Sequence, residues 1–334
     1  MIPRSTFELE VGGRRVRLGV RTLIMGVLNV TPDSFSDGGL YLAPERAVQR
    51  GLQMVREGAD WIDVGGESTR PASHPVSTEE ELRRVLPVIQ GLRRKLRAVP
   101  ISIDSTKAEV AEEALGAGAN IVNDVSGLRF DPRLAEVARR HRAPLILMHL
   151  RGRPETMQVK PFAQDIWRSF THGFETSIRR AVAAGMRRSQ IILDPGLGFG
   201  KSRRQNYEIL ASLEKLRRFR LPVLVGSSRK SFVQAIVAGE GLNPSRAGAH
   251  GQARPRISRA MQRGVIFRRH LEQAGGASLG LLTDSAPLAI GDAAAVVAAI
   301  LGGAHIVRVH DPAAVLAAVR VADALLAANN PGGP

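Results

Sequence analysis

Six polar side chains stand at or just after the ends of short apolar runs that are separated by helical patterns. Runs such as ISID, NIVND and IILD are apolar until their last residues, which carry a carboxylate or an amide. In an α/β barrel the strand bodies are buried and their carboxyl ends face the site. We therefore expect one end of a barrel to bring all six together. They are Asn29, Asp104, Asn123, Asp194, Lys230 and Arg308.

The chemistry of these side chains suits a flat heterocycle with hydrogen-bonding edges. The carboxylates of Asp104 and Asp194 can accept paired N–H groups, and the ammonium of Lys230 can donate to a carbonyl oxygen. An aspartate or asparagine before a helix is often only a helix cap, so any one of them could be structural. The prediction of a pocket depends on the convergence of the whole set.

A second group of residues suits an anionic leaving group such as pyrophosphate. Arg70, Arg308 and His310 can donate to oxyanions, and Asn29 follows the first barrel strand. Arginine binds such oxygens through paired N–H groups, and pyrophosphate normally brings Mg²⁺, which takes oxygen ligands. The stretch GLGFGK after Asp194 looks like a phosphate loop, but it lacks the P-loop spacing and is weak as a nucleotide motif.

The apolar runs supply the scaffold that these residues need. Eight strands are expected, ending near residues 29, 65, 104, 123, 149, 194, 226 and 309. They predict a single-domain (β/α)8 TIM barrel over residues 1–330, since such a barrel needs about 250 residues. The interval between strands seven and eight is much longer than the others. An insertion over about 239–286, rich in Arg and Gly, is therefore predicted to be flexible.

Local signals predict several further features of the elements. Phe7 to Leu18 is expected to form a hairpin about Gly12-Gly13 and to plug the bottom of the barrel. Ser77 with Glu80 predicts a capping box. Aspartates followed by proline predict two more helix starts, Asp131-Pro132 and Asp311-Pro312.

The composition excludes several classes of protein. The 334 residues include no cysteine, so disulfides and thiolate chemistry are excluded, which suits a reducing cytoplasm. No run approaches the roughly 20 apolar residues of a membrane helix, and the first 22 residues lack the apolar centre of a signal peptide. We therefore expect a cytoplasmic enzyme without a membrane partner.

The formal net charge of +16 raises the alternative of a non-catalytic basic barrel that binds RNA through the Arg-rich insertion. Aromatic residues make up only 4% of the chain, so platforms for base stacking are scarce. A solvated, Arg-biased surface is the preferred interpretation. A positive field would also attract an anionic substrate.

The motifs at the eight expected strands resemble those of the dihydropteroate synthases, a family of pterin-binding enzymes. They occur in the family's order, over about residues 20–232 and 287–322: GVLNVTPDSFSDGG, DVGGESTRP, ISIDSTK, NIVNDVSG, LMH, ILDPGLGFGK, SSRKSF and IVRVHD. The resemblance implies condensation of 6-hydroxymethyl-7,8-dihydropterin diphosphate with p-aminobenzoate in folate biosynthesis. It also implies a homodimer and an enzyme of the class that sulfonamides target.

The resemblance also assigns roles, position by position. Asp104, Asn123, Asp194 and Lys230 would hold the pterin, with Met148 and Phe199 as walls of its pocket. Asn29 would help bind Mg²⁺ and diphosphate, with Arg70, Arg308 and His310 on the diphosphate oxygens. Phe35, Thr69, Pro71 and Ser231 would shape the p-aminobenzoate site. The catalytic roles would fall to Asp104, Lys230 and Arg308.

A pterin-dependent methyltransferase on a similar barrel is the nearest alternative. It would share the acids that hold the pterin but would not need STRP, SRKS or RVHD, and all three are present. His149, at the end of LILMH, is interpreted as a packed imidazole rather than a catalytic base.

Overall fold

The computed structural model describes residues 4–31, 43–68, 75–153, 157, 164–242 and 286–329. Eight short parallel strands form its centre, and each predicted strand end lies within one residue of the observed end. The strands are β3 (Leu23–Asn29), β4 (Trp61–Gly65), β5 (Ile101–Asp104), β6 (Ile121–Asp124), β7 (Leu145–Met148), β8 (Ile191–Asp194), β9 (Leu224–Gly226) and β10 (Ile306–Val309).

The sheet closes into a barrel, as predicted. Hydrogen-bonded neighbours follow the order β8-β7-β6-β5-β4-β3-β10-β9. A parallel bridge between Leu193 and Val223, with the Leu193 amide donating to the Pro222 carbonyl over 2.9 Å, joins the two ends of that order. The strand interiors are fully buried, as a parallel sheet with helices outside and side chains inside requires.

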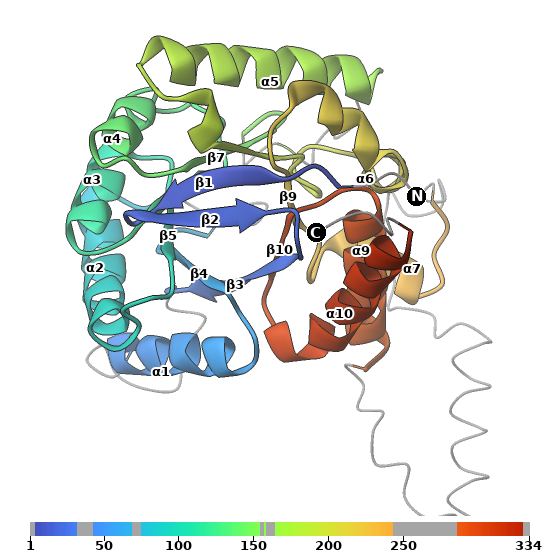
Figure 1. The fold of residues 1–334 in the computed structure, drawn as a ribbon, viewed down its shortest axis with the longest axis horizontal. Coiled ribbons are helices and arrows are strands. Elements are labelled where there is room, and N and C mark those ends of the chain that lie inside the picture. The colour runs from blue at the N-terminus through green and yellow to red at the C-terminus, as the bar shows by residue number, and fades with distance from the viewer. Residues whose placement is uncertain are drawn as a thin grey trace, which may run out of the picture.

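Helices alternate with the strands and surround the barrel (Figure 1). None of the described helices is long and apolar enough to cross a membrane. They are α1 (Ala43–Arg56), α2 (Thr78–Lys95), α3 (Ala108–Gly116), α4 (Leu134–Arg140), α5 (Ile166–Ala183), α6 (Arg203–Ala211), α7 (Ser231–Val237), α9 (Ala286–Leu301) and α10 (Pro312–Ala328), with the 3₁₀ turns η2 (Arg188–Gln190) and η3 (Leu213–Phe219).

Two of the three predicted helix starts are found where expected, and the third lies two residues further along the chain. The Ser77 side chain accepts from the Glu80 amide at the start of α2, although the Glu80 carboxylate pairs with neighbouring arginines rather than completing the box. Asp311 caps α10. At α4 the N-cap position is Arg133, two residues after the predicted Asp131. The Asp131 carboxylate accepts from the Arg133 amide over 3.1 Å through Oδ1 and from the Ala108 amide at the start of α3 over 3.0 Å through Oδ2.

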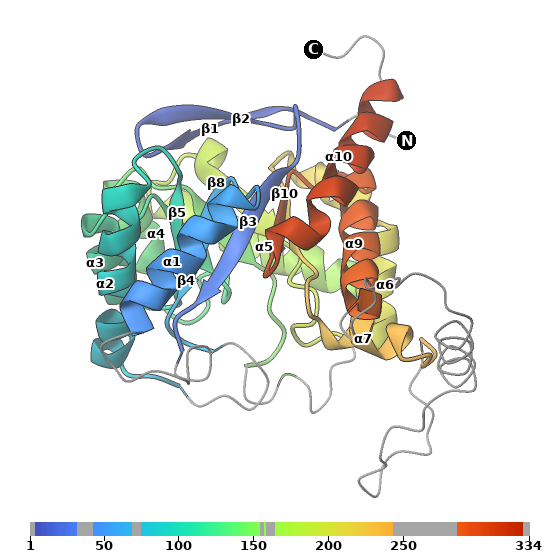
Figure 2. The same cartoon turned by 90° about the horizontal axis from the view of Figure 1, so that it is seen from below.

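The predicted hairpin covers one end of the barrel (Figure 2). β1 (Phe7–Val11) and β2 (Arg14–Leu18) pair antiparallel, with positive φ at both turn glycines. Leu9, Val11 and Leu18 are buried against side chains from the amino-terminal parts of the strands. The hairpin therefore seals the end opposite the strand carboxyl ends.

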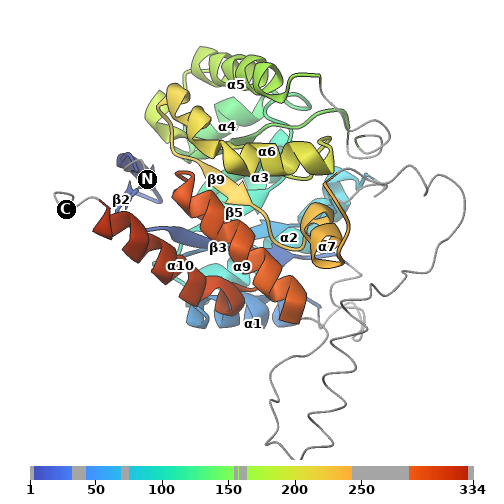
Figure 3. The same ribbon diagram turned by 90° about the vertical axis from the view of Figure 1, so that its right-hand side faces the viewer.

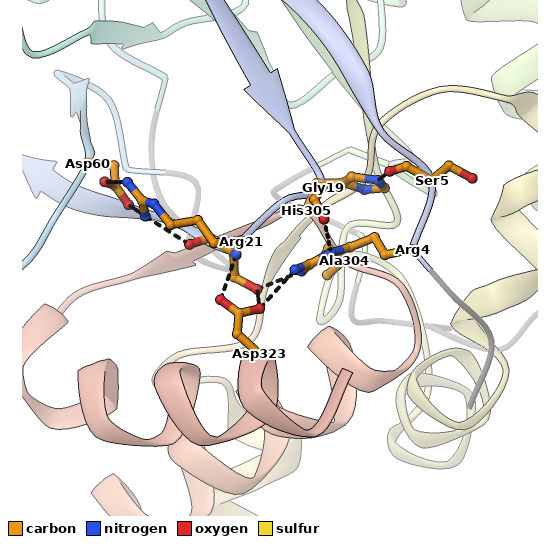
Figure 4. A network of polar contacts seen from close by, with 9 residues as sticks. Arg4, Ser5, Gly19, Arg21, Asp60, Ala304, His305 and Asp323 are labelled. Carbon is orange, nitrogen blue, oxygen red and sulfur yellow. Dashed lines mark hydrogen bonds and ion pairs between the residues drawn. The ribbon is translucent and has the colours of Figure 1, made fainter. Parts of the chain in front are cut away.

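Polar contacts fasten the segment before the hairpin to the last helix (Figure 4). The Arg4 guanidinium donates to Asp323 over 2.8 Å and to the Ala304 carbonyl over 2.8 Å. His305 donates from Nε2 to the Ser5 carbonyl over 3.0 Å, while its Nδ1 accepts from the Val223 amide over 3.1 Å. Burial lowers the pKa of His305 to about 4, which keeps this imidazole neutral.

Insertion residues 243–285 lie outside the described part of the chain, so the prediction for 239–286 is not tested over that range.

Candidate functional site

The strand register brings the predicted residues to the carboxyl end of the barrel. Asn29 pairs with Gly65, Gly65 with Asp104, and Asp104 with Asn123. A small cavity opens at this end. Its lining comprises Asn123, Val125, Met148, Asp194, Gly196, Leu197, Phe199, Gly226, Lys230 and Arg308.

Arg308 is the cation that joins the acidic groups of the site. Its Nε donates to Asp63 over 2.6 Å and its Nη2 donates to Asp104 over 2.7 Å. Asn123 donates from Nδ2 to the same Asp63 oxygen over 3.0 Å. The two carboxylates raise the pKa of Arg308 further, against the opposing effect of burial, so the guanidinium stays charged.

Burial dominates the electrostatics of Asp104. It raises the pKa of Asp104 to about 8, although the Arg308 guanidinium acts in the opposite direction and nearby carboxylates reinforce the rise. The Asp104 side chain is 9% exposed. A carboxyl group in this state can change protonation near neutral pH, which is typical of functional sites.

Asp194 and Lys230 form the other side of the cavity. Burial raises the pKa of Asp194, while the Gly196 amide opposes that rise by donating to Oδ1 over 2.7 Å. Burial also lowers the pKa of Lys230 to about 8, and the charge of Arg308 adds to that effect. The site thus holds an acceptor, Asp194, and a donor, Lys230, and the pKa of each differs from its ordinary value.

Apolar side chains wall the cavity as predicted. Met148 and Phe199 belong to one buried cluster with Val125, and both line the cavity. The Lys230 ammonium lies 4.2 Å from the centre of the Phe199 ring. A flat ring that enters here would meet apolar walls and polar edges together.

A chain of hydrogen bonds connects His310 to α9. The Ser228 hydroxyl lies 3.4 Å from His310 Nδ1 and donates to Asp292 over 3.2 Å. Asp292 also accepts from the Arg229 amide with both oxygens, over 2.9 and 3.1 Å. Arg229 has a φ of 57°, an uncommon backbone conformation for a residue that is not glycine, so Asp292 stabilises the turn that precedes Lys230.

The chain matches one family of known proteins in sequence. Residues 25–269 match the family model "Pterin binding enzyme". A dihydropteroate synthase of Synechocystis is 42% identical over 95% of this chain and 94% of its own length. The chain belongs to the dihydropteroate synthases.

Solved structures of other members agree with the fold. The Xanthomonas albilineans synthase with 4-aminobenzoic acid is 34% identical, with a TM-score of 0.76 over 99% of this chain and all of its own. The Yersinia pestis synthase in a sulfonamide complex is 37% identical, with a TM-score of 0.75 over 96% of this chain and 99% of its own. The chain is therefore a transferase of folate biosynthesis, and the family expected from its motifs is confirmed.

Two further predicted residues, Ser231 and Asn29, adjoin this centre. Ser231 is the exposed first residue of α7, next to Lys230. Asn29 lies at the end of β3, and its Oδ1 and the Asp104 Oδ2 both lie within 4 Å of the place a Cβ on Gly65 would take. Four predicted residues, Phe35, Thr69, Arg70 and Pro71, lie outside the described residues.

His149 is packed as expected. Its ring lies edge-on to Phe170 with centroids 4.4 Å apart, and Nε2 lies 3.2 Å from the Ser169 hydroxyl. Burial holds the pKa of His149 well below its usual value. These contacts favour a structural role over acid–base catalysis in the synthase.

Two residues of the synthase site were missed in the sequence. Asp63 has no exposed surface, yet it accepts from both Arg308 and Asn123. The signal was a carboxylate in the middle of the apolar run WIDVG, which is costly unless it is paired. For Asp292, nothing in the local sequence indicated its bonds to residues more than sixty positions earlier.

Proposed function

We propose that this synthase joins 6-hydroxymethyl-7,8-dihydropterin diphosphate to p-aminobenzoate, giving 7,8-dihydropteroate and diphosphate. The observation that carries the proposal is the convergence of Asp104, Asn123, Asp194, Lys230 and Arg308 at the carboxyl end of the barrel. A pterin-dependent methyltransferase and an RNA-binding barrel are less well supported, because the most similar proteins compared are synthases throughout.

The pterin ring would lie between Met148 and Phe199. Asp194 and Asn123 would accept and donate along the edge of the ring that carries its amino group and ring N–H. Lys230 would donate to the pterin carbonyl. The three polar groups differ in type, which is what distinguishes the edges of a heterocycle from one another.

Asp104 and Arg308 would act on the charge that develops in the reaction. The bond between the pterin methylene and the diphosphate oxygen breaks, so positive charge spreads over the pterin and negative charge collects on the diphosphate. The carboxylate of Asp104 would stabilise the first and the guanidinium of Arg308 the second, with His310 beside it. The neutral arylamine nitrogen then attacks the methylene and loses a proton, so a strong general base is not required.

Mg²⁺ is implied by the diphosphate substrate, and Asn29 fits it. Its carboxamide oxygen is a hard donor and stands beside the gap over Gly65, opposite Asp104. Among the described residues no group of three acidic or histidine side chains could hold a metal without the substrate. This agrees with an ion that takes most of its ligands from water and phosphates. When bound, Mg²⁺ would supply positive charge for the departing diphosphate.

A turnover assay tests the proposal. With both substrates and Mg²⁺, we expect diphosphate release and dihydropteroate formation. Asp104→Asn should lower turnover far more than it weakens pterin binding. The lost charge should reduce transition-state stabilisation by roughly 2 to 4 kcal/mol. Unchanged turnover in this variant would remove Asp104 from the mechanism.

Sulfonamides should compete with p-aminobenzoate, since a related synthase binds one.

We further propose a cytoplasmic homodimer that pairs through α9 and α10, which lie side by side on one flank of the barrel (Figure 3). Apolar side chains on these helices are unusually exposed: Ile290 is 63% exposed and Val321 is 60% exposed. Exposed apolar patches often mark interaction sites. Sedimentation analysis of the wild type against a Val321→Asp variant tests the assignment, and a wild-type monomer would contradict it.

A further inference from the structure

Lys201, the last residue of GLGFGK, is buried at the back of the pterin pocket with only 2% of its surface exposed. Its ammonium donates to three backbone carbonyls, those of His149 over 2.8 Å, Gly196 over 2.8 Å and Phe199 over 3.0 Å. A buried lysine with three carbonyl partners has no N–H group left for a substrate. The residue is therefore neither a phosphate ligand nor a nucleophile in this structure.

The geometry requires the charged form of Lys201. An ammonium has three N–H groups, whereas a neutral amine has two and would direct its lone pair at the third carbonyl oxygen. Burial lowers the pKa of Lys201 well below its usual value, and the carboxylate of Asp194 opposes that change. The ring of Phe170, 5.5 Å from Nζ, adds a further favourable contact for a cation.

The three carbonyls belong to the two segments that wall the pocket. His149 directly follows Met148, the wall at the end of β7. Gly196 and Phe199 belong to the loop after β8, which carries the second wall and the amide that donates to Asp194. One ammonium thus connects the two segments that carry the walls.

We propose that Lys201 is a positioning residue that sets the separation of Met148 and Phe199 and thereby selects a flat pterin-sized ring. This inference rests on the proposed function, because it assumes that the pterin lies between these walls. Without the ammonium, three buried carbonyls would lose a charged donor. The loop after β8 would then be held less firmly to the end of β7, where Arg151 Nη1 still donates to the Gly200 carbonyl over 3.2 Å. A change of about 1 Å in the position of a bound substrate can cost on the order of a hundredfold in rate.

Steady-state kinetics of Lys201→Met test the proposal. We expect the KM for the pterin diphosphate to rise at least tenfold, with a lower kcat. The KM for p-aminobenzoate, measured at saturating pterin diphosphate, should stay within about threefold. A loss of folding alone would lower the apparent kcat through the amount of active protein and would leave each KM unaltered. The split between substrates is therefore specific to the pocket.

Two further variants complete the test. Lys201→Arg keeps the charge but cannot direct three N–H groups from one point, so we expect it to fold and still to show the raised KM for the pterin diphosphate. Lys215→Met is the matched control, because Lys215 is exposed and its ammonium lies over the face of Trp167, 4.8 Å from the ring centroid. It should leave both KM values unchanged.

The outcomes separate the two proposals. If Lys201→Arg has the wild-type KM for the pterin diphosphate, Lys201 does not position the walls. If Lys201→Met folds and both KM values are unchanged, the same conclusion holds. If the wild type itself shows no turnover with these substrates, the proposed function fails and the positioning role fails with it.

Discussion

The Arg308 guanidinium donates to the Asp104 carboxylate over 2.7 Å, although 204 residues separate the two along the chain. Its Nε donates to Asp63 at the same time, so one guanidinium is paired with two buried carboxylates. The arrangement makes Arg308 important for folding as well as for chemistry.

Replacing Arg308 by Met should reduce stability markedly. Asp63 has no exposed surface, and a buried carboxylate left without its cation costs about 3 to 5 kcal/mol. Denaturant unfolding measures the effect. Arg21→Met is the control, because the Arg21 side chain is 59% exposed and its pair with Asp60 should contribute about 1 kcal/mol or less. The double variant Asp63→Asn/Arg308→Met removes the buried charge together with its cation. If it regains stability but has no turnover, the role of Arg308 in folding is separate from its role in the chemistry.

The pH dependence of kcat/KM should be a narrow bell with its maximum near pH 8. Asp104 must be ionised and has a pKa of about 8, so activity rises with pH through that value. Lys230 must be protonated and also has a pKa of about 8, so activity falls above it. The measured limbs belong to the coupled site rather than to single residues.

Variants assign these limbs. Asp104→Asn should remove the acidic limb from its residual activity, and Lys230→Arg should move the alkaline limb upward. A profile that stays flat between pH 6 and pH 10 would contradict both assignments.

His305 should make the fold acid-sensitive. In the unfolded chain the imidazole has its ordinary pKa of 6.5, whereas in the folded chain burial lowers the pKa of His305 to about 4. Stability from this group is therefore complete above pH 6.5 and is lost as the pH falls to 4, by about 3 kcal/mol. Urea unfolding at several pH values measures it. His305→Asn, which keeps an acceptor for the Val223 amide, should flatten that dependence, and an unaltered slope would exclude His305 as the cause.

Asp292→Ala should loosen the turn that holds Lys230. The Arg229 amide would lose both of its acceptors in a backbone conformation that is already uncommon, which should cost about 1 to 3 kcal/mol of stability. We also expect kcat/KM to fall, because Lys230 follows directly. Asp165→Ala removes a helix cap on α5, a different element, and should reduce stability without a change in kcat/KM. Equal kinetic effects of the two substitutions would argue against the role of Asp292.

The barrel was predictable because buried parallel strands have a simple sequence pattern. The apolar runs end at or just before a polar or glycine residue, and each of the eight predicted ends lies within one residue of the observed one. The hairpin was predictable for a similar reason, since Gly12 and Gly13 both adopt positive φ. The start of α4 was predicted two residues too early, because the local Asp-Pro pattern could not show that Arg133 takes the N-cap position and that the Asp131 carboxylate is shared with α3.

The electrostatics of the site could not be predicted from the sequence. Asp104 and Asp194 were placed at the correct end of the barrel, but their raised pKa values depend on burial by segments distant in sequence. Lys201 lies in a motif that looks like a phosphate loop, yet all of its N–H groups are used by carbonyls. Only the packing of two loops distinguishes these possibilities.

The link between Asp63 and Arg308 also orders the assembly of the chain during synthesis. Asp63 leaves the ribosome 245 residues before the arginine that neutralises it. Any nascent intermediate that closes its sheet without β10 must bury a carboxylate without its cation, or leave that part of the sheet open to water. Early strands can pair, but a dry barrel interior has to wait for the last strand. The cavity at the carboxyl end of the barrel therefore forms late, and a ligand that binds there cannot assist folding of the nascent chain until nearly all of it has been made.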